Sequence, residues 1–236
     1  MKAVDDAEDL EIGGLYAPGR DGLILDDHRM SANQSALKGC DVIIELTHPE
    51  ASDENVPVWR DYGADLVIGT SGYDTARLDL LKNCWGNIES RCLVVPNFSI
   101  GAVLMMRFAE MAAPYFESSE IMEMHHFDKP DAPSGTSLQT AYRVAAARRQ
   151  AVHSRGDEIV SGALGATVEG IPVHSLRVHG VLAHQEVIFG TTGQYLTIRH
   201  DTTKYEAFSQ GVVISLRQID SLPPGITVGI DGLLGI

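Results

Sequence analysis

Short apolar runs alternate with longer amphipathic segments through the first half of the chain. Runs of four or five mostly apolar residues are typical of buried strands, and they occur at 42–46, 64–68 and 92–95. The segments that follow these runs have helical spacing, which predicts helices at 51–62, 75–83 and 102–111. Thr75 suits the N-cap of the second helix. Residues 10–16 predict only a short strand, followed by a turn at 17–22. Strands that alternate with helices at this spacing predict an α/β fold with a parallel sheet.

The pattern changes in the second half of the chain. Residues 119–124 alternate weakly and predict a strand, and residues 139–150 predict a helix with a basic end. The polar, Gly-rich stretch 152–170 is predicted to be a mobile loop. Glycine-containing turns then separate three strands of an apparently antiparallel sheet, predicted at 173–178, 183–189 and 195–200. A helix is expected at 206–216, and residues 226–236 fit either a last strand or a tail.

Small or polar residues follow each of the three predicted parallel strands. Parallel sheets bind ligands beyond the carboxyl ends of their strands, where this sequence has Thr47-His48, Gly69-Thr70-Ser71 and Asn97-Phe98. Glycine and asparagine also form ordinary turns, and for any one of these loops that explanation is sufficient. Three such loops in succession favour a ligand crevice at this edge of the sheet.

One segment, residues 123–136, concentrates groups with catalytic chemistry. A free imidazole titrates near ~6.5, so His125 can exchange a proton near neutral pH. Lys129 adds a cation, and Ser134 suits the N-cap of a helix whose free N–H groups bind carboxylate or phosphate. These groups suit an anionic small molecule that receives a proton. The alternative is that the histidines are surface loop residues and that Ser134 is only a cap.

Composition narrows the function classes. The 236 residues include 32 acidic and 18 basic side chains, and the net charge of −14 argues against nucleic-acid binding. No apolar run approaches the ~18 residues of a membrane span, and the chain begins without the apolar core of a signal peptide. We therefore expect a cytoplasmic protein without a membrane partner. The three cysteines have unrelated spacings, which fit reduced thiols better than disulfides or a zinc site.

The segment Glu-Met-His-His-Phe-Asp-Lys-Pro-Asp-Ala-Pro-Ser-Gly-Thr at 123–136 resembles the E-x-H-H-x-x-K-x-D-A-P-S-G-T signature of bacterial dihydrodipicolinate reductases. These enzymes are also called 4-hydroxy-tetrahydrodipicolinate reductases. Other stretches are similar to that family in the same order, at 47–49, 69–72, 96–101, 173–177, 184–190 and 196–200. The resemblance covers roughly 41–216, and its signature is long and specific.

The resemblance implies a Rossmann-like parallel sheet plus an α+β domain with a mixed sheet for substrate binding and tetramerisation. The dinucleotide-binding domain is expected at 1–99 and 210–236, and the substrate-binding and oligomerisation domain at 100–209. The implied reaction is the reduction of 4-hydroxy-tetrahydrodipicolinate, a cyclic dicarboxylate, to tetrahydrodipicolinate by NADPH or NADH. This reaction belongs to diaminopimelate and lysine biosynthesis, and the implied assembly is a homotetramer.

The resemblance also implies roles for individual residues. His125 is expected to be the proton donor and Lys129 a second catalytic cation. Contacts to the substrate carboxylates are expected from His126, Ser134, Gly135 and Thr136. The nicotinamide is expected against Gly69, Thr70, Ser71, Val95, Pro96, Asn97 and Phe98. A positioned acid contributes roughly 10²–10⁴-fold to a proton transfer, and cations over the carboxylates hold the ring in place.

The family pattern is incomplete at the start of this sequence. The family opens with a strand, a G-x-x-G-[RK]-[MV]-G loop and a helix that bind the pyrophosphate, and the loop is not found here, so the first strand is apparently missing. Gly13-Gly14 is too short to replace the loop. Leu15-Tyr16-Ala17 stand where an acidic residue for the ribose is expected, and Arg20 is a candidate for a 2′-phosphate or simply a solvated side chain.

Two explanations follow from this departure. The chain is either an incomplete version of a longer protein, which we favour, or a reduced form with weak cofactor affinity. An alternative function is therefore a non-catalytic dicarboxylate-binding relative that lacks a functional nucleotide clamp. A metal site formed by Glu123, His125, His126 and Asp128 is disfavoured, because adjacent residues on a strand point to opposite faces. We expect no metal.

Overall fold

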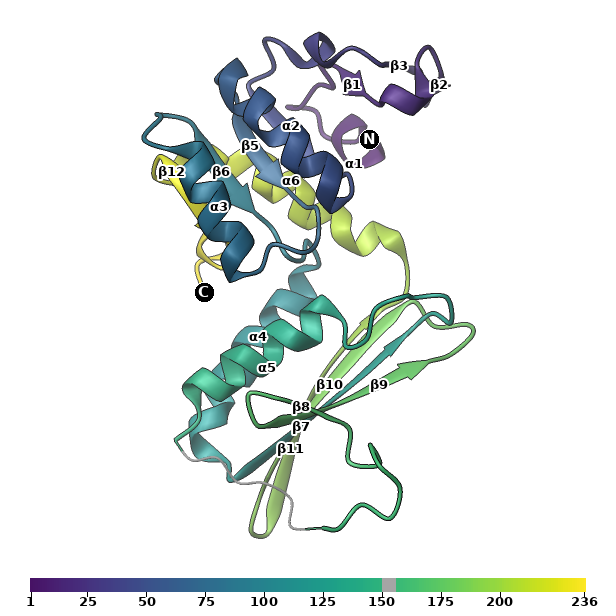
Figure 1. The fold of residues 1–236 in the computed structure, drawn as a ribbon, viewed down its shortest axis with the longest axis vertical. Helices are drawn as coiled ribbons and strands as arrows, with labels where there is room; N and C mark the ends of the chain where they lie inside the picture. Colours follow the sequence, from purple (N-terminus) through teal and green to yellow (C-terminus); the bar gives the residue numbers. More distant parts are fainter. Residues whose placement is uncertain (150–155) are drawn as a thin grey trace. The chain divides into compact units, whose positions relative to one another are not determined.

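The computed structural model describes residues 1–149 and 156–236, which form two units (Figure 1). The first unit comprises residues 1–98 and 208–236, and the second comprises residues 99–207. The first contains a parallel sheet and the second a mixed sheet, with helices in both. The predicted fold class, a Rossmann-like parallel sheet plus an α+β unit with a mixed sheet, is confirmed.

A four-stranded parallel sheet with strand order β12-β6-β5-β4 forms the centre of the first unit. Its strands are β4 (Val42–Glu45), β5 (Asp65–Ile68), β6 (Arg91–Val94) and β12 (Gly225–Val228). Leu66 and Leu93, on the two central strands, are fully buried, as expected for apolar runs in a parallel sheet. The three strands predicted from those runs are confirmed to within a residue. β12 pairs with β6, so the C-terminal segment begins with a strand.

The helices of the first unit are α1 (Lys2–Asp5), α2 (Pro49–Tyr62), α3 (Thr75–Trp85) and α6 (Ser209–Gln218). α2 begins two residues earlier than predicted, because Pro49 suits the first helical turn and His48 accepts the Ala51 N–H. Thr75 is not the N-cap of α3. Asp74 takes that position, and its Oδ1 accepts the Arg77 N–H at 2.9 Å. The remaining helical turns are the 3₁₀ segments η1 (Pro18–Arg20), η2 (Gln34–Leu37), η5 (Ile219–Ser221) and η6 (Gly232–Leu234).

A small three-stranded sheet precedes β4 in the chain. It consists of β1 (Leu15–Tyr16), β2 (Ile24–Leu25) and β3 (His28–Ser31) in the order β1-β3-β2. The strand predicted at 10–16 forms only at its last two residues. Gly14 lies directly against the carbonyl of Ala36, so a Cβ at this position would clash with the η2 turn. This Gly-Gly pair therefore serves close packing.

The sheet of the second unit has strand order β11-β10-β7-β9-β8. Its strands are β7 (Ser118–His125), β8 (Ala166–Val168), β9 (Ile171–Arg177), β10 (Ala183–Thr191) and β11 (Gln194–Thr202). β10 is antiparallel to both β7 and β11, but β9 runs parallel to β7. The antiparallel arrangement predicted from the glycine turns is therefore confirmed for β10 and β11 but wrong for β9, which pairs in parallel with β7. The connection from β7 to β9 passes through a helix, and such a crossover permits parallel neighbours.

Two helices, α4 (Ile100–Ala112) and α5 (Gly135–Ala147), lie side by side on one face of this sheet (Figure 1). Their buried residues Ala109 and Val144 pack with Ile121 and Val187 of the sheet. α5 begins four residues earlier than predicted, directly after its N-cap Ser134. Gln150, the last residue of that prediction, lies outside the described residues. The 3₁₀ segments η3 (Ala113–Tyr115) and η4 (Tyr205–Phe208) complete the helical turns.

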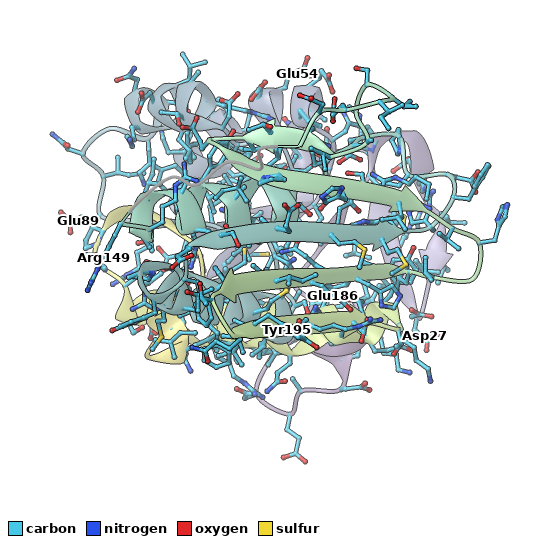
Figure 2. The ribbon with its side chains drawn as sticks, turned by 90° about the horizontal axis from the view of Figure 1, so that it is seen from below. Asp27, Glu54, Glu89, Arg149, Glu186 and Tyr195 are labelled. Atoms are coloured by element: carbon cyan, nitrogen blue, oxygen red, sulfur yellow. The ribbon has the colours of Figure 1, made fainter. Side chains whose placement is uncertain are left out.

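Side chains alternate between the two faces of the mixed sheet, and every second one points to the face that α4 and α5 do not cover. Figure 2 looks onto this open face, where Glu186 and Tyr195 are labelled. Tyr195 is 79% exposed, and Met122 and Ile188 are only partly buried. Arg199 of β11 pairs with Glu186 of β10 across two neighbouring strands. The face therefore mixes apolar and charged side chains.

The loop predicted at 152–170 is only partly described, since 152–155 lie outside the described residues. Within the remainder, β8 pairs with β9, so the prediction of a loop throughout is wrong there. The described part of the chain contains no helix long and apolar enough to cross a membrane.

Candidate active site

His125 is the last residue of β7, the central strand of the mixed sheet. Glu123 lies two residues earlier and therefore on the same face of the strand. The Glu123 side chain is fully buried, whereas the His125 side chain is 15% exposed. Nδ1 of the imidazole is hydrogen-bonded to Oε2 of Glu123. The Glu123 carboxylate thus binds Nδ1 of the His125 ring, and the second ring nitrogen is Nε2.

Arg177 ends β9 and pairs with His125 in the parallel register of the sheet. Its Nη1 lies 3.1 Å from Oε1 and 3.1 Å from Oε2 of Glu123. Burial alone would raise the pKa of Glu123, but hydrogen bonds from His125, Ser175 and Arg177 outweigh burial and lower the pKa below its usual value. The buried carboxylate is therefore ionised at neutral pH.

The loop after β7 carries Lys129. Its Nζ donates to Oδ1 of Asp131 at 2.6 Å, and its side chain is 19% exposed. Nη2 of Arg177 donates to the main-chain carbonyl of Asp131. Polar contacts therefore run from His125 through Glu123 and Arg177 to the residue that pairs with Lys129. The structure joins both predicted catalytic residues in one network.

The start of α5 is held by a buried polar network. Ser134 accepts the Ser137 N–H at 3.2 Å, which confirms it as the N-cap. The Ser137 hydroxyl donates to Oε1 of Gln185 at 2.8 Å, and Nε2 of Gln185 donates to the Thr140 hydroxyl at 2.7 Å. These bonds fix the first turn of α5 to β10. Gly135 faces open space, since a Cβ there would meet no atom within 4 Å.

The other two residues predicted to contact substrate flank these features. His126 is exposed, and its main-chain carbonyl accepts the Lys129 N–H at 3.2 Å. Thr136, in the first turn of α5, is partly buried. Phe127 stacks on His179 with 4.4 Å between ring centroids, which ties the loop after β7 to the loop after β9.

All seven residues predicted to contact the nicotinamide lie in the first unit, after β5 and β6. A Cβ at Gly69 would stand 2.5 Å from Cε2 of Phe98 and 2.6 Å from Cδ2 of Leu46. Gly69 therefore lets these two apolar side chains approach at the carboxyl ends of three adjacent strands. Leu46 is 60% exposed there, whereas Thr70 is buried. The four other residues range from the buried Val95 to the partly buried Asn97 and the exposed Ser71 and Pro96.

A buried carboxylate also braces the end of β4. Glu45 is 3% exposed and accepts hydrogen bonds from the Thr47 N–H at 2.9 Å, from Nδ2 of Asn55 at 3.1 Å and from Nε1 of Trp59 at 2.8 Å. These donors fix the Thr47-His48 loop against α2. Among residues 1–149 and 156–236 no group of three or more acidic, histidine or cysteine side chains is arranged to hold a metal ion.

The second unit thus offers a proton-transfer group, a lysine cation and an open helix start. Comparison with known families gives this chemistry its context. The model described as "Dihydrodipicolinate reductase, N-terminus" matches residues 2–98, and "Dihydrodipicolinate reductase, C-terminus" matches residues 101–234. The chain belongs to the dihydrodipicolinate reductase family.

Relatives in this family are similar along most of the chain. The 4-hydroxy-tetrahydrodipicolinate reductase of Cutibacterium acnes is 44% identical over 100% of this chain and 92% of its own length. That of Thermobifida fusca is 47% identical over 83% of this chain and 82% of its own length. A dipicolinate-bound dihydrodipicolinate reductase from Paenisporosarcina sp. TG-14 is 34% identical, with a TM-score of 0.82 over 98% of this chain and 92% of that structure.

More distant structures share only the fold. D-galactose-1-dehydrogenase from Rhizobium etli is 10% identical, with a TM-score of 0.61 over 98% of this chain and 85% of its own. At this identity the likeness shows the architecture alone.

No role was predicted from the sequence for Arg177, Gln185 or Glu45, and Glu123 was considered only for the disfavoured metal site. The burial of Glu123 could have been predicted from the sequence. It follows Ile121 by two residues, so both side chains lie on the core-facing side of β7. An acid on a core face must find donors, since a lone buried charge is costly. Its partner Arg177 is 54 residues away, and spacing alone does not predict such a pairing.

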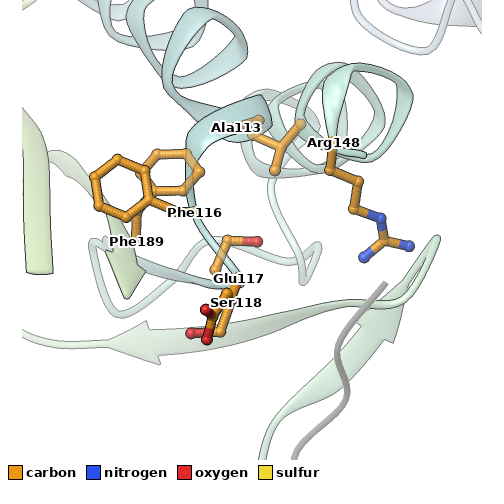
Figure 3. Close-up of a pocket in the computed structure, with 8 residues that line it drawn as sticks. Ala113, Phe116, Glu117, Ser118, Arg148 and Phe189 are labelled. Atoms are coloured by element: carbon orange, nitrogen blue, oxygen red, sulfur yellow. The ribbon is translucent and has the colours of Figure 1, made fainter. Parts of the chain in front are cut away.

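A separate pocket lies among η3, the C-terminal end of α5, the start of β7 and β10 (Figure 3). Phe116, Glu117, Arg148 and Phe189 are among its lining residues, and its volume of about 10 Å³ suits a single water molecule. It lies at the opposite end of β7 from His125, ~20 Å away along an extended strand. This pocket is not part of the candidate active site.

Proposed function

We propose that this protein catalyses the NADPH- or NADH-dependent reduction of 4-hydroxy-tetrahydrodipicolinate to tetrahydrodipicolinate, a step of diaminopimelate and lysine biosynthesis. The similarity to 4-hydroxy-tetrahydrodipicolinate reductases over most of the chain carries this proposal. The network that links His125 to the Lys129 loop supports it, because it joins an acid and a cation near an open helix start.

In this mechanism His125 is the proton donor and Lys129 the second catalytic cation. His126, Gly135 and Thr136 contact the substrate carboxylates, and the free N–H groups at the start of α5 attract them. The hydroxyl of Ser134 is engaged as the N-cap, so Ser134 contributes by holding that helix start in place. When bound, the nicotinamide cofactor supplies the hydride. His125 then delivers a proton to the neighbouring ring carbon.

The first unit is proposed as the dinucleotide-binding domain and the second as the substrate-binding domain. Leu46, Gly69 and Phe98 form an apolar surface at the strand ends that fits one face of a nicotinamide ring. Thr70, Ser71, Val95, Pro96 and Asn97 complete the proposed contacts. The proposed hydride donor is a reduced nicotinamide dinucleotide, NADPH or NADH.

The proposed assembly is a homotetramer, and the proposed compartment is the cytoplasm. The open face of the mixed sheet, with its partly buried Met122 and Ile188 and exposed Tyr195, is a surface suited to self-association. All three cysteines are free thiols, as is usual in a reducing compartment.

Oxidation of NADPH and of NADH, followed with and without the cyclic dicarboxylate, tests the function. Oxidation should require the dicarboxylate, and His125→Ala and Lys129→Ala should each lower kcat at least ~100-fold. His28→Ala, in the first unit, is the matched control and should retain wild-type kcat. Undiminished kcat in both site variants would remove these residues from the mechanism.

The alternative is a non-catalytic relative that holds a dicarboxylate. Separate calorimetric titrations with pyridine-2,6-dicarboxylate (dipicolinate), with NADPH and with NADH distinguish the two functions. Binding of both ligands supports the reductase. Binding of dipicolinate with no detectable binding of either NADPH or NADH would favour the alternative.

A further inference from the structure

Glu123 is the most enclosed charged side chain near His125. It is fully buried, and both of its oxygens have partners, because Oε2 meets Nδ1 of His125 and both oxygens meet Nη1 of Arg177. The residue beside it on β10 is Gln185, which is uncharged. Its charged neighbours are thus His125 on its own strand and Arg177 on β9.

An ionised acceptor fixes the orientation of an imidazole. A carboxylate only accepts hydrogen bonds, so Nδ1 of His125 must carry the hydrogen that points at Glu123. The second proton of the charged ring then resides on Nε2. When Nε2–H gives that proton to a carbon, the N–H electron pair stays on Nε2 and a C–H bond forms. The ring is left neutral with its Nδ1–H intact, and Glu123 remains ionised.

Arg177 connects this pair to the rest of the site. One end of its guanidinium binds Glu123, and the other donates to the carbonyl of Asp131, whose side chain pairs with Lys129. A planar guanidinium with its donors in a fixed fork sets the geometry between the groups it binds. Arg177 therefore fixes the end of β7 relative to the loop that bears Lys129.

We propose that Glu123 and Arg177 are positioning residues of the reaction. Glu123 selects the ring form of His125 in which Nε2 carries the transferable proton, and Arg177 holds Glu123 and the Lys129 loop in register. This inference rests on the proposed function, in which His125 is the proton donor. Neither residue needs to touch the substrate.

Glu123→Gln is the primary test, because it keeps the shape of the side chain and removes its charge. We expect kcat to fall at least ~10-fold, with the dipicolinate dissociation constant within about 3-fold of wild type. A fall in kcat without a matching loss of dipicolinate affinity separates a positioning role from a general disturbance of the site. Glu123→Asp should recover part of the lost kcat, since it restores the charge.

Glu120→Gln is the matched control. It removes a carboxylate that meets an imidazole, His174, at 2.7 Å, but on the other face of the same strand. Its kcat and its dipicolinate dissociation constant should equal those of the wild type. If Glu123→Gln does not fold, the double variant Glu123→Gln/Arg177→Gln removes both charges and leaves neither buried alone. The double variant should show the same loss of kcat and the same retained dipicolinate affinity.

A folded Glu123→Gln or double variant with wild-type kcat would overturn the positioning role. A second readout does not depend on activity. Two-bond ¹⁵N–¹H spectra of histidine-labelled protein at alkaline pH should show the Nδ1–H form for His125, and the Nε2–H form would overturn the proposal. If the wild type fails to oxidise NADPH or NADH with substrate, the proposed function fails, and these spectra still decide how Glu123 holds the ring.

Discussion

The Nζ of Lys129 lies 2.6 Å from Oδ1 of Asp131, two residues further along the same loop. Burial would raise the pKa of Asp131, but the hydrogen bond from Lys129, a backbone hydrogen bond and the nearby cations lower the pKa below its usual value. The lysine proposed to act on an anionic substrate is therefore already neutralised by an internal carboxylate. A substrate carboxylate that binds Lys129 has to compete with Asp131.

Asp131→Asn should therefore strengthen dicarboxylate binding. The variant removes one negative charge beside Lys129 but keeps the main-chain carbonyl that Arg177 binds. We expect dipicolinate to bind ~3–5-fold more tightly at low salt, because an exposed ion pair is worth up to ~1 kcal/mol. The gain should shrink at high ionic strength. Calorimetric titration measures both effects.

Asp79→Asn is the control for this prediction. It breaks a comparable pair, since Nζ of Lys82 lies 2.8 Å from Oδ1 of Asp79, but on α3 of the first unit. Its dipicolinate affinity should match that of the wild type. If Asp131→Asn binds dipicolinate as tightly as the wild type or more weakly, the main effect of Asp131 is to orient Lys129 and not to compete with the substrate carboxylate.

Local pattern predicted the parallel strands well, because each is an apolar run that needs burial on both faces. It placed helix starts less well. Thr75 and Asp74 are both good caps, and only the backbone conformation at Asp74 decides between them. The orientation of β9 also escaped prediction, since glycine turns suggest hairpins, whereas β9 enters the sheet after α5 and pairs with β7.

The site was predictable where its residues are close in sequence. His125, Lys129 and the Ser134 cap stand within one loop and its flanks, so their chemistry is visible in the segment itself. Arg177 joins them only because β9 pairs with β7. Gln185 reaches α5 only because β10 pairs with the other edge of β7. Such partners depend on sheet order, which the sequence pattern did not specify.

Gly69→Ala should weaken cofactor binding in the first unit. The new Cβ would stand 2.5 Å from Phe98 and 2.6 Å from Leu46, so the apolar surface proposed to hold the nicotinamide must shift. We expect KM for NADPH and for NADH to rise ~10-fold, because a side chain displaced by about 1 Å loses up to about half of its dispersion energy with a bound ring. Steady-state kinetics at saturating dicarboxylate measure this change.

Gly232→Ala is the matched control, because a Cβ there meets no atom within 4 Å. It should leave both KM values unchanged. If Gly69→Ala also leaves them unchanged while the protein stays folded, the strand ends at Leu46 and Phe98 do not form the nicotinamide surface.

Cys92 should be the least reactive thiol of the folded protein. It is fully buried on β6, and burial raises its pKa, so it holds little thiolate at any ordinary pH. The number of thiols that react with a disulfide reagent at pH 8 should be the same in Cys92→Ala and the wild type. The two should differ by one thiol only after denaturant is added. Cys84→Ala, which alters a partly buried thiol, should remove one reactive group from the native count. Rapid loss of the Cys92 thiol in native protein would contradict this assignment.

His200 should make the second unit less stable in mild acid. Its ring packs against Gly101, and its Nε2 lies 3.3 Å from the Ser99 hydroxyl. Burial lowers the pKa of His200 below its usual value of 6.5, with His184 adding to this effect and Asp201 opposing it. The folded protein therefore binds this proton less readily than the unfolded chain. Stability from neutral His200 is present above pH 6.5 and is lost as pH falls below it.

Thermal unfolding of His200→Gln and of the wild type at pH 7.5 and pH 5.5 tests whether stability falls with pH because of His200. The wild type should lose ~2 °C or more in Tm over this interval relative to the variant, because only the wild type pays to protonate or expose the ring. His179→Gln, a change in an exposed loop, should follow the wild type. An identical pH dependence in His200→Gln and wild type would show that the ring is protonated as easily in the folded unit as in the unfolded chain. The packing of His200 on Gly101 would then not exclude water from Nε2.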